Sequence, residues 1–366
     1  MTRGLVILAA GGTGGHLFPA FALAEALGRR DLVVDLVTDE RGDRYGTGFP
    51  ARTIHQVPAA TLKDRSPVGA ARTVAALARG VKRAYAILGE LRPKVVVGFG
   101  GYPTFPPIVA ARLRGIPTLI HEQNAVMGRA NRMLIGRVTA VAASWEGTGH
   151  VPPAALAKVR VTGNPVRQAV IDWSRKRFEP PAADGPFRLV VFGGSQGARY
   201  FSDTVPVALA SLSPARRSRL RVVQQCREED LERVRGFYRE AGIAAELAAF
   251  FRDLPERMAN AHLVIARSGA SSVSELAVLG RPSLLVPLPH SIDNDQLMNA
   301  RRLAEAGGAI AIEQKDLSSE RLAAEIARLM DDGTGLAAMA AGARSLGRPD
   351  AVEALADLVE DLAGLR

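Results

Sequence analysis

Two stretches indicate the fold: LVILAAGGTGGH at residues 5–16 and LVVFGGSQGA at residues 189–198. Each starts with an apolar run typical of a buried strand, passes into a glycine-rich turn and opens a helical pattern. Glycine has no Cβ, so backbone N–H groups and a helix N-terminus can converge on an anion at such a turn. The repeat predicts two similar α/β domains, and a phosphorylated substrate is the first functional hypothesis.

Strand-like runs alternate with helical patterns through both halves of the chain. The runs are residues 5–10, 33–38, 95–98 and 117–121 in the first half and 188–192, 221–225, 263–266 and 283–287 in the second. Such alternation predicts parallel sheets covered by helices on both faces. Ligands of these sheets bind beyond the carboxyl ends of the strands, where both glycine turns lie. We expect the linker at Pro165 and in the polar stretch 172–185.

The composition fits two soluble domains, because 366 residues with 47% hydrophobic content exceed one ordinary core. No apolar stretch approaches the roughly 20 residues of a membrane-spanning helix, and the first run is shorter than the apolar core of a signal peptide. Cys226 is the only cysteine. It excludes an internal disulfide and suits a reducing cytoplasm.

The net charge of +10 comes from the first half. Residues 1–167 hold 22 Lys and Arg against 10 Asp and Glu, a net of +12, whereas the remainder holds 25 against 27, a net of −2. A one-sided basic field fits an acidic partner, which could be nucleic acid, an anionic membrane surface or a phosphorylated substrate. A solvated basic face without a partner is the alternative.

Residues 66–92 predict a basic amphipathic helix. At ~100° per residue, one side carries Val74, Leu77, Val81, Tyr85 and Leu88, and the opposite side carries Arg72, Arg79 and Arg83. Near an anionic leaflet each cation contributes on the order of 1 kcal/mol. Weak peripheral membrane attachment is therefore one hypothesis, and a solvated surface helix is the other.

The last segment is acidic and amphipathic. Its apolar residues are Val352, Leu355, Leu358 and Leu362, and its outer residues are Glu353, Asp357, Glu360 and Asp361. We expect this final helix to pack back on the basic first domain.

Neither glycine turn is a standard nucleotide fingerprint. Leu17 stands where a dinucleotide fold needs its third glycine, and no Gly-Lys-Ser/Thr closes a P-loop. Asp39 ends the second strand where a ribose-binding acid would lie, so a dinucleotide stays a minor alternative. The second turn also matches G-x-S-x-G of a serine hydrolase, with Ser195 followed by Asp253 and then His262 or His290. The first turn bears His16 and no serine, which a phosphate-binding pair explains better.

Metal ligation has little support in the sequence. The pair His121-Glu122 lacks the second histidine of H-E-x-x-H. Asp293 and Asp295 form an Asp-x-Asp that could hold a divalent ion. We favour helix capping for them, because they precede the helical pattern 296–306.

A third small-residue turn, SGASSVSE at residues 268–275, again offers N–H groups to phosphate. Glu275 would lie in the first turns of the following helix. Its carboxylate can accept two hydrogen bonds from the vicinal hydroxyls of a ribose, or it can simply stabilise the helix N-terminus.

Six motifs occur together in order: GGTGGHLFPA at 11–20, GFGGYP at 98–103, HEQNAVMGRAN at 121–131, GNPVR at 163–167, GGSQGAR at 193–199 and the segment 267–296. Over nearly the full chain they resemble the MurG family, the peptidoglycan N-acetylglucosaminyltransferases. The resemblance implies an α/β GT-B fold, in which two Rossmann-like domains with parallel sheets flank a cleft. It implies an acceptor- and membrane-facing domain at residues 1–165, joined by the C-terminal helix 344–366, and a UDP-sugar-binding domain at 166–343.

The same resemblance implies an inverting transfer of N-acetylglucosamine from UDP-N-acetylglucosamine. The acceptor would be the 4-hydroxyl of undecaprenyl-pyrophosphoryl-N-acetylmuramyl-pentapeptide, and no metal or other cofactor is required. A peripheral protein at the cytoplasmic face of the bacterial plasma membrane is implied, with cell-wall or division proteins as possible partners and no nucleic acid. A UDP-sugar epimerase is an alternative, but it needs no lipid acceptor and no basic helix.

The site residues of the family are assigned to this chain by matching motif positions. His16 is the candidate general base, a role that suits imidazole near neutral pH. The implied substrate-binding residues are Thr13, Gly14, Gly15, Asn124, Arg167, Ser195, Phe251, Ala270, Ser271, Ser272, Val273, Ser274, Glu275 and Gln296. Ser195 matches a donor-phosphate contact, Phe251 a residue whose backbone reads uracil, and Gln296 a sugar contact. The chain departs from the family pattern at Gln225-Cys226-Arg227 and Asn294-Asp295.

Overall fold

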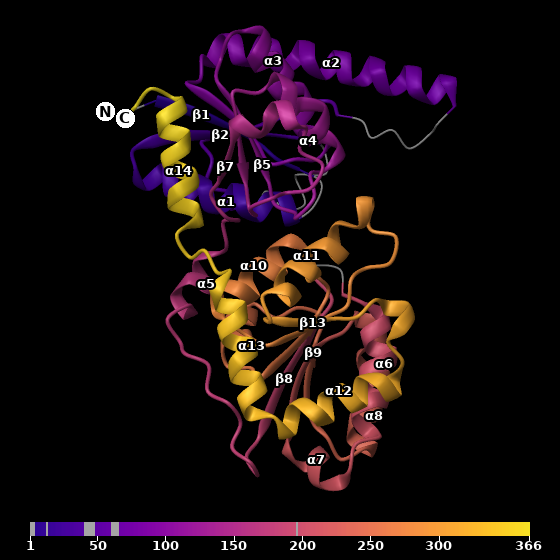
Figure 1. Ribbon diagram of the computed structural model, residues 1–366. Helices are drawn as coiled ribbons and strands as arrows, with labels where there is room; N and C mark the ends of the chain where they lie inside the picture. Colours follow the sequence, from indigo (N-terminus) through magenta and orange to yellow (C-terminus); the bar gives the residue numbers. More distant parts are fainter. Residues whose placement is uncertain (1–3, 12–13, 40–47, 60–65, 195–196) are drawn as a thin grey trace. The chain divides into compact units, whose positions relative to one another are not determined.

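The computed structural model describes residues 4–11, 14–39, 48–59, 66–194 and 197–366. The chain divides into two compact units (Figure 1). Unit 1 comprises Met1–Arg167 and Asp350–Arg366, and unit 2 comprises Gln168–Pro349. Each unit is a parallel sheet with helices packed on both faces, as the alternating sequence pattern predicted.

Within the described residues the sheet of unit 1 has the strand order β3-β2-β1-β4-β5-β6-β7, and every pairing is parallel. The strands are β1 Gly4–Ala9, β2 Leu32–Thr38, β3 Thr53–Gln56, β4 Val95–Gly98, β5 Thr118–Glu122, β6 Ala140–Ala143 and β7 Val159–Val161. The order reverses between β1 and β4. Doubly wound sheets bind their ligands at this switch point, beyond the carboxyl ends of the strands.

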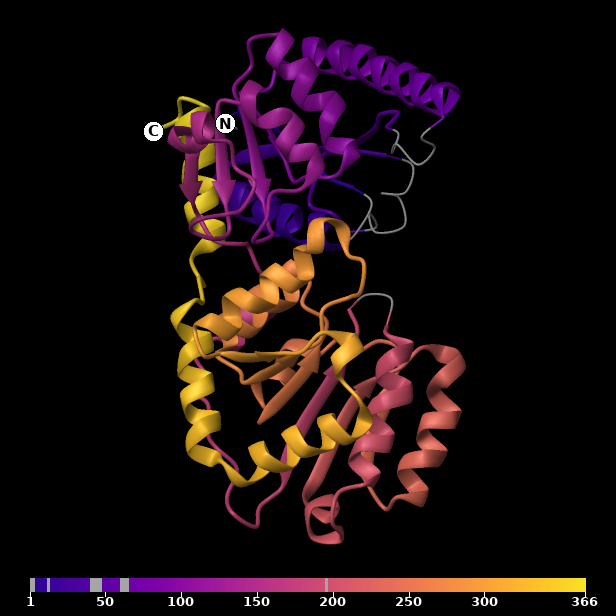
Figure 2. The same ribbon diagram turned by 45° about the vertical axis from the view of Figure 1, so that its right-hand side comes forward.

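Helices cover both faces of this sheet. They are α1 Gly14–Arg29, α2 Pro67–Leu91, α3 Phe105–Leu113, α4 Arg129–Leu134 and α14 Ala351–Leu362, with short 3-10 turns η2 Tyr102–Thr104, η3 Ile135–Arg137 and η4 Pro153–Lys158. Alternating residues of β1 enter two cores: Val6 and Leu8 pack with α1 and α14, and Ile7 packs with α2, α3 and α4. Figures 1 and 2 show α2 lying along α3.

The predicted amphipathic helix is α2, and its start is capped by Ser66, whose Oγ accepts a hydrogen bond from the Gly69 N–H at 3.0 Å. Its buried face differs from the predicted one. Leu88 is buried as expected, but Val74 and Tyr85 are 63% and 41% exposed.

Gly80 explains this difference. A Cβ at Gly80 would overlap the carbonyl oxygen of Pro58 and press against Pro106, so α2 makes its closest approach through this glycine. At 3.6 residues per turn, Val74 and Tyr85 lie about 120° and 140° from Gly80 around the helix. The closest packing therefore uses the small residue and turns both larger side chains outward.

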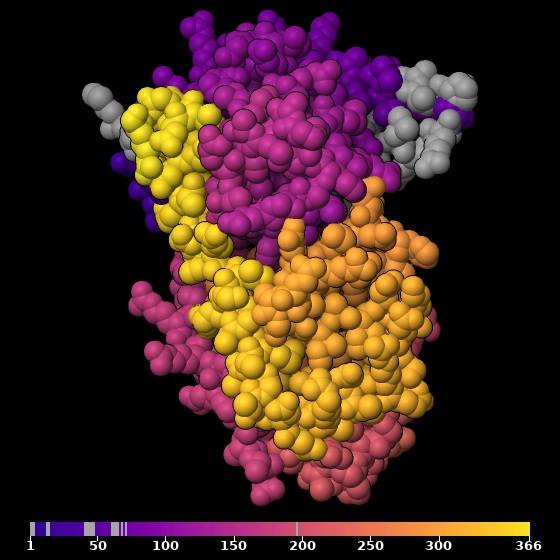
Figure 3. Space-filling model, viewed as in Figure 1, coloured from indigo at the N-terminus to yellow at the C-terminus, as the bar shows by residue number. Residues whose placement is uncertain are grey.

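The final helix, α14, packs on α1, as its acidic pattern predicted. Figure 3 shows the C-terminal segment lying against unit 1. Arg30, directly after α1, forms ion pairs with Glu353, Asp357 and Glu360 of α14. A cation at the C-terminus of α1 thus meets the acidic face of α14.

Within the described residues the sheet of unit 2 has the order β10-β9-β8-β11-β12-β13, again all parallel. The strands are β8 Phe187–Phe192, β9 Leu220–Gln225, β10 Ala244–Ala248, β11 Leu263–Ala266, β12 Ser283–Leu285 and β13 Ala309–Ala311. Numbered from the first strand of each unit, this order repeats that of the first six strands of unit 1. The switch point of unit 2 lies between β8 and β11.

The helices of unit 2 are α5 Gln168–Trp173, α6 Arg199–Ala210, α7 Pro214–Arg219, α8 Leu231–Glu240, α9 Leu254–Ala259, α10 Ala270–Leu279, α11 Asp295–Glu305, α12 Ser319–Asp331 and α13 Gly333–Ser345. Three 3-10 turns are η5 Glu228–Asp230, η6 Ile292–Asn294 and η7 Gln314–Asp316. Leu189 and Val191 of β8 share a core with α6, α8 and α12. Helix α10 is almost wholly buried and packs against α5, α9, α11 and α13.

The boundaries between the units differ from the predicted ones. The segment 172–185, expected as a linker, belongs to unit 2, and the chain returns to unit 1 at Asp350 rather than at residue 344. Two arginines explain both differences. Buried Arg281 donates to the carbonyl oxygens of Lys176 and Ala259, and Arg344 donates to that of Ser174 at 2.7 Å, which binds this stretch to unit 2.

Candidate active site

The described glycine-rich residues lie at the switch point of each sheet. In unit 1, Gly11 follows β1, and Gly100 and Gly101 follow β4. In unit 2, Gly193 follows β8 and Gly269 precedes α10. Within each unit, the strand order thus brings together turns that are distant in sequence. Thr13 and Ser195, both predicted to bind substrate, lie outside the described residues.

His16 lies in the first turn of α1, which Gly14 and Gly15 open. Its ring donates a hydrogen bond to the carbonyl oxygen of Gly11. Burial lowers the pKa of His16, and the bond to Gly11 opposes this only in part. One ring nitrogen is therefore held by a carbonyl group, and a neutral imidazole keeps its other nitrogen as a proton acceptor.

Two glycines with positive φ make room for this imidazole. A Cβ on Gly100 would lie 3.3 Å from His16 Nε2, and one on Gly101 would lie 3.4 Å from Cε1. Their φ angles of 85° and 73° also disfavour other residues. The motif GFGGYP thus shapes one wall of the histidine site.

The motif HEQN ends β5 and connects the neighbouring loops. His121 is fully buried, and its Nε2 donates to the carbonyl oxygen of Gly163 at 3.1 Å. Gln123 Nε2 lies 3.1 Å from His121 Nδ1 and donates to the carbonyl oxygen of Phe99 at 2.9 Å. Burial lowers the pKa of His121 to about 4, so this ring is neutral near pH 7 and serves to orient the loop at Gly163.

Glu122 holds Asn124, one of the predicted substrate-binding residues. Its Oε1 accepts hydrogen bonds from the backbone N–H of Asn124 at 3.0 Å and from Asn124 Nδ2 at 3.3 Å. Arg167, another predicted residue, closes unit 1 with its guanidinium 5.7 Å from the ring centre of Phe18. The sequence pattern assigns Glu122 no binding role of its own. The available signal is a carboxylate two residues before Asn124.

In unit 2, Gln225 joins two loops at the carboxyl end of the sheet. Its Oε1 accepts from the N–H of Gly193 at 3.2 Å, and its Nε2 donates to the carbonyl oxygen of Ala249 at 3.0 Å. The departure from the family pattern at this position therefore has a structural effect. A long amide side chain connects the glycine turn after β8 with the loop after β10.

The third small-residue turn, residues 268–275, is hydrogen-bonded to α11. Ser268 Oγ donates to the carbonyl oxygen of Gln296 at 2.7 Å, and Asn299 Nδ2 donates to that of Ser268 at 3.1 Å. The predicted residues Ala270, Ser271, Ser272, Val273, Ser274 and Glu275 form the start of α10. Glu275 is 5% exposed and Ser274 is 7% exposed. This segment thus presents the start of a helix at the switch point, and the N–H groups before Val273, which donates the first bond, to the carbonyl oxygen of Gly269, are those that a helix leaves without an internal partner.

Arg267, which sequence reasoning did not single out, connects the ends of β11 and β12. Its Nη1 donates to the carbonyl oxygens of Val286 and Pro287, both at 3.1 Å, and its Nη2 donates to Gln314 Oε1 at 2.6 Å. Burial lowers its pKa. The guanidinium therefore holds the loop that leads from β12 to Gln296.

Phe251 lies in the loop beyond β10, and Gln296 lies in the first turn of α11, after the loop beyond β12; both are predicted to bind substrate. Phe251 is buried, and the Arg257 guanidinium lies 4.5 Å from its ring centre. Gln296 Oε1 accepts from the N–H of Leu288 at 3.0 Å. Both residues are thus held by contacts within unit 2, at the same end of the sheet as α10.

The hydrolase alternative finds no support among the described residues. His262 precedes β11, whereas Gly193 and Gly194, the described residues before Ser195, follow β8, so His262 and these glycines stand at opposite ends of a parallel sheet. His262 Nδ1 accepts from the Arg188 N–H at 3.1 Å. Asp253 is paired with Arg257 Nε at 2.9 Å. His290 is exposed in the loop after β12.

Among the described residues, no group of three or more His, Cys, Asp and Glu side chains is arranged to hold a metal ion. Asp295 Oδ1 accepts from the N–H of Gln296 at 2.7 Å in the first turn of α11, whose N-cap residue is Asn294 and makes no side-chain capping bond. Asp293 and Asn294 both have φ of 55°.

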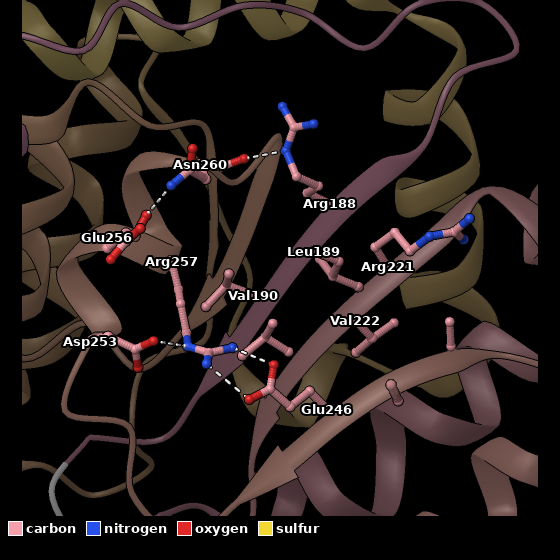
Figure 4. Close-up of a pocket in the computed structure, with 13 residues that line it drawn as sticks. Arg188, Leu189, Val190, Arg221, Val222, Glu246, Asp253, Glu256, Arg257 and Asn260 are labelled. Carbon is pink, nitrogen blue, oxygen red and sulfur yellow. Dashed lines mark hydrogen bonds and ion pairs between the residues drawn. The ribbon is translucent and has the colours of Figure 1, made fainter.

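A cavity of about 570 Å³ lies elsewhere in unit 2 (Figure 4). Its lining includes Arg188, Arg221 and Val190 of the sheet and Glu256 and Asn260 from α9 and the residue after it. Because Arg188 and Arg221 stand near the amino ends of β8 and β9, this cavity lies away from the glycine turns. In Figure 4 Arg257 reaches from α9 to Glu246, and the same side chain contacts Phe251.

Two family models match the chain. The glycosyltransferase family 28 N-terminal domain matches residues 6–143, and the glycosyltransferase family 28 C-terminal domain matches residues 188–355. Two similar curated proteins are named UDP-N-acetylglucosamine–N-acetylmuramyl-(pentapeptide) pyrophosphoryl-undecaprenol N-acetylglucosamine transferase. The one from Mesorhizobium japonicum is 53% identical over 366 residues, covering 99% of this chain and 96% of the relative. The one from Nitrobacter hamburgensis is 52% identical over 364 residues, covering 100% and 98%.

Solved structures agree with this result. MurG of Acinetobacter baumannii superposes with a TM-score of 0.81 at 29% identity, covering 98% of this chain and 100% of that one. A putative UDP-N-acetylglucosamine 2-epimerase from Listeria monocytogenes gives a TM-score of 0.67 at 14% identity, covering 99% and 96%. The second likeness shows a shared fold only. It carries no argument for the epimerase alternative.

Proposed function

The chain belongs to the MurG family of glycosyltransferases, and we propose that it makes the lipid-linked disaccharide used in peptidoglycan synthesis. It transfers N-acetylglucosamine from UDP-N-acetylglucosamine to the 4-hydroxyl of undecaprenyl-pyrophosphoryl-N-acetylmuramyl-pentapeptide, with inversion at the anomeric carbon. The observation that carries this proposal is identity above 50% to enzymes of that name over nearly the whole chain. The GT-B architecture of two doubly wound units agrees with it.

His16 is the proposed general base. The second nitrogen of its imidazole takes the proton of the acceptor 4-hydroxyl as the oxygen attacks the anomeric carbon and the bond to the UDP oxygen breaks. A lowered pKa keeps the ring neutral near pH 7, and the carbonyl oxygen of Gly11 orients it. The role rests on family resemblance together with this local geometry.

The proposed donor site lies in unit 2. N–H groups at the start of α10 and of the turn at Gly193 would stabilise the diphosphate as its negative charge grows, which is how preorganised dipoles assist a leaving group. Glu275 would accept hydrogen bonds from the ribose hydroxyls, the backbone of Phe251 would read uracil, and Gln296 would contact the sugar. In this scheme Ser195 contacts the donor phosphate, and no metal or other cofactor takes part.

We further propose peripheral attachment to an anionic membrane surface through unit 1, at the cytoplasmic face of the plasma membrane. Arg72, Arg79 and Arg83 are exposed on α2, and the exposed Val74 and Tyr85 add apolar surface to the same helix. Such a combination binds headgroups and the acyl boundary together. Of the helices that the structure describes, none has the length and hydrophobicity needed to cross a bilayer. Cell-wall and division proteins are the proposed partners there, with roles in cell shape and cell division.

The test is transfer of labelled sugar from UDP-N-acetylglucosamine to the lipid-linked muramyl-pentapeptide, run with EDTA and without acceptor as a control. We expect acceptor-dependent labelled lipid in the presence of EDTA. If transfer fails and a fluorophosphonate labels Ser195, the hydrolase alternative replaces this proposal. Loss of transfer on EDTA addition alone contradicts the metal-free mechanism.

A further inference from the structure

Asn131 has a buried amide oxygen for which no hydrogen-bond donor is found among the residues that the structure describes. The residue is 2% exposed, and its Oδ1 is buried without a partner. Its Nδ2 is fully engaged, because it donates to Glu122 Oε2 at 2.8 Å and to the carbonyl oxygen of His121 at 3.1 Å. A buried acceptor without a donor costs free energy, so a native site that keeps one calls for an explanation.

Asn131 lies close to the proposed base, His16. A single Cβ built on Gly100 would lie 3.3 Å from His16 Nε2 and 3.6 Å from Asn131 Nδ2. The imidazole and the amide therefore border the same glycine. Asn131 belongs to α4 and His16 to α1, so the fold brings them together at the switch point of unit 1.

Glu122 determines which way the Asn131 amide points. Both oxygens of its carboxylate accept only from N–H groups: Oε1 from Asn124, and Oε2 from the backbone of Gly128 at 2.9 Å and from Asn131 Nδ2. A carboxylate can only accept hydrogen bonds, so the amide of Asn131 must turn its NH2 group, and not its oxygen, toward Glu122. The Asn131 oxygen is then the end of the amide left to meet a ligand.

We propose that Asn131 Oδ1 accepts a hydrogen bond from an O–H or N–H group of the acceptor sugar, and that Glu122 is the positioning residue that orients it. The inference rests on the proposed function, because the donor group belongs to the lipid-linked muramyl substrate. The Asn131 amide and the imidazole of His16 would then contact the same sugar. Asn131 would provide binding and orientation, and His16 would take the proton.

The experiment measures steady-state transfer while each substrate is varied in turn. Asn131→Ala removes the acceptor oxygen, and the loss of one neutral hydrogen bond predicts a rise of about fivefold to tenfold in the KM of the lipid-linked acceptor. The KM of UDP-N-acetylglucosamine should change less than about twofold, since no donor contact is lost.

Glu122→Gln tests the positioning role. The new Nε2 group would face the Asn131 NH2, which forces one amide to rotate and presents a donor where an acceptor stood. We expect the acceptor KM to rise at least as far as in Asn131→Ala. The double variant should be no worse than Glu122→Gln alone, because Glu122 acts on the acceptor through Asn131.

A matched control separates positioning from stability. Thr118 starts the same strand that Glu122 ends, is fully buried, and accepts through Oγ1 from the Thr139 N–H at 3.2 Å. Thr118→Val should lower the melting temperature and leave both KM values unchanged. An unchanged acceptor KM in Asn131→Ala, an additive rise of the acceptor KM in the double variant, or equal rises of the acceptor and donor KM values in Asn131→Ala would overturn the inference. Absence of transfer by the unaltered chain would instead overturn the proposed function.

Discussion

Nη1 of Arg30 donates a hydrogen bond to Oε2 of Glu360 at 2.7 Å and so joins the end of α1 to the C-terminal helix. Glu360 is 4% exposed, whereas Arg30 also reaches the more exposed Glu353 and Asp357. Arg366 also contacts Asp357 and Glu360. One arginine, Arg30, thus pairs with a buried carboxylate and two outer ones.

The first prediction concerns this ion-pair cluster. Arg30→Met leaves the Glu360 carboxylate buried with a weaker partner, and we expect the free energy of unfolding to fall by about 2 kcal/mol. Denaturant unfolding measures the change. Arg29→Met is the matched control: its exposed pair with Glu353 should contribute only about 0.5 kcal/mol or less. Equal effects of the two substitutions would show that burial of Glu360 is unimportant.

The second prediction concerns the proposed base. His16→Ala should lower kcat by ~10²-fold or more and leave the affinity for UDP-N-acetylglucosamine nearly unchanged, as expected for loss of a general base. Transfer assays and donor titration measure the two quantities. His150→Asn, an exposed histidine of the same unit in a left-handed conformation that asparagine tolerates, serves as the control. Unchanged turnover in His16→Ala would remove the base assignment.

The pH dependence of transfer follows from the lowered pKa of His16, which is caused first by burial. A general base must be unprotonated, so activity falls only when the pH drops through the pKa of the folded protein. We therefore expect kcat/KM to keep its neutral-pH value down to the ordinary histidine pKa of 6.5 and to decline only in more acidic solution. An acid limb centred above 6.5 would show that a different group controls the reaction.

Substitution of Glu275 tests whether this residue binds the donor or only stabilises the helix. Its carboxylate is buried near the start of α10, where it can bind ribose hydroxyls or simply complement the helix dipole. Glu275→Ala should raise the KM of UDP-N-acetylglucosamine ~10-fold or more, since hydrogen bonds to a charged group are lost. The exposed Glu256→Ala on α9 is the control. A lower melting temperature with a normal KM would assign Glu275 to capping alone.

The membrane proposal depends on the charge of α2. Changing Arg72, Arg79 and Arg83 to Glu should greatly reduce sedimentation with anionic vesicles, because each cation contributes on the order of 1 kcal/mol near such a surface. A control with the same change in charge replaces three exposed arginines of unit 2, Arg221, Arg235 and Arg239. If both triple variants sediment alike, net charge alone is responsible and attachment does not involve α2.

Local patterns in the sequence predicted much of the fold. The strands with the longest apolar runs and the capped helix at Ser66 occur close to their predicted positions. The sequence pattern did not reveal β3, β6, β7, β10 and β13, which are short or lie toward the edges of the sheets. Such strands are stabilised by a neighbouring strand and a covering helix, so their own residues carry a weak signal.

Sequence patterns alone establish that the chain forms two glycine-turn α/β units, that unit 1 is basic, and that six ordered motifs mark its family. The partners of individual side chains depend on the tertiary fold. Gly80 turned Val74 and Tyr85 outward, Gln225 joined two loops, and Glu122 oriented Asn131 beside His16. Periodicity reports which face of an element is buried, whereas hydrogen bonds between distant segments depend on which strands become neighbours in the sheet.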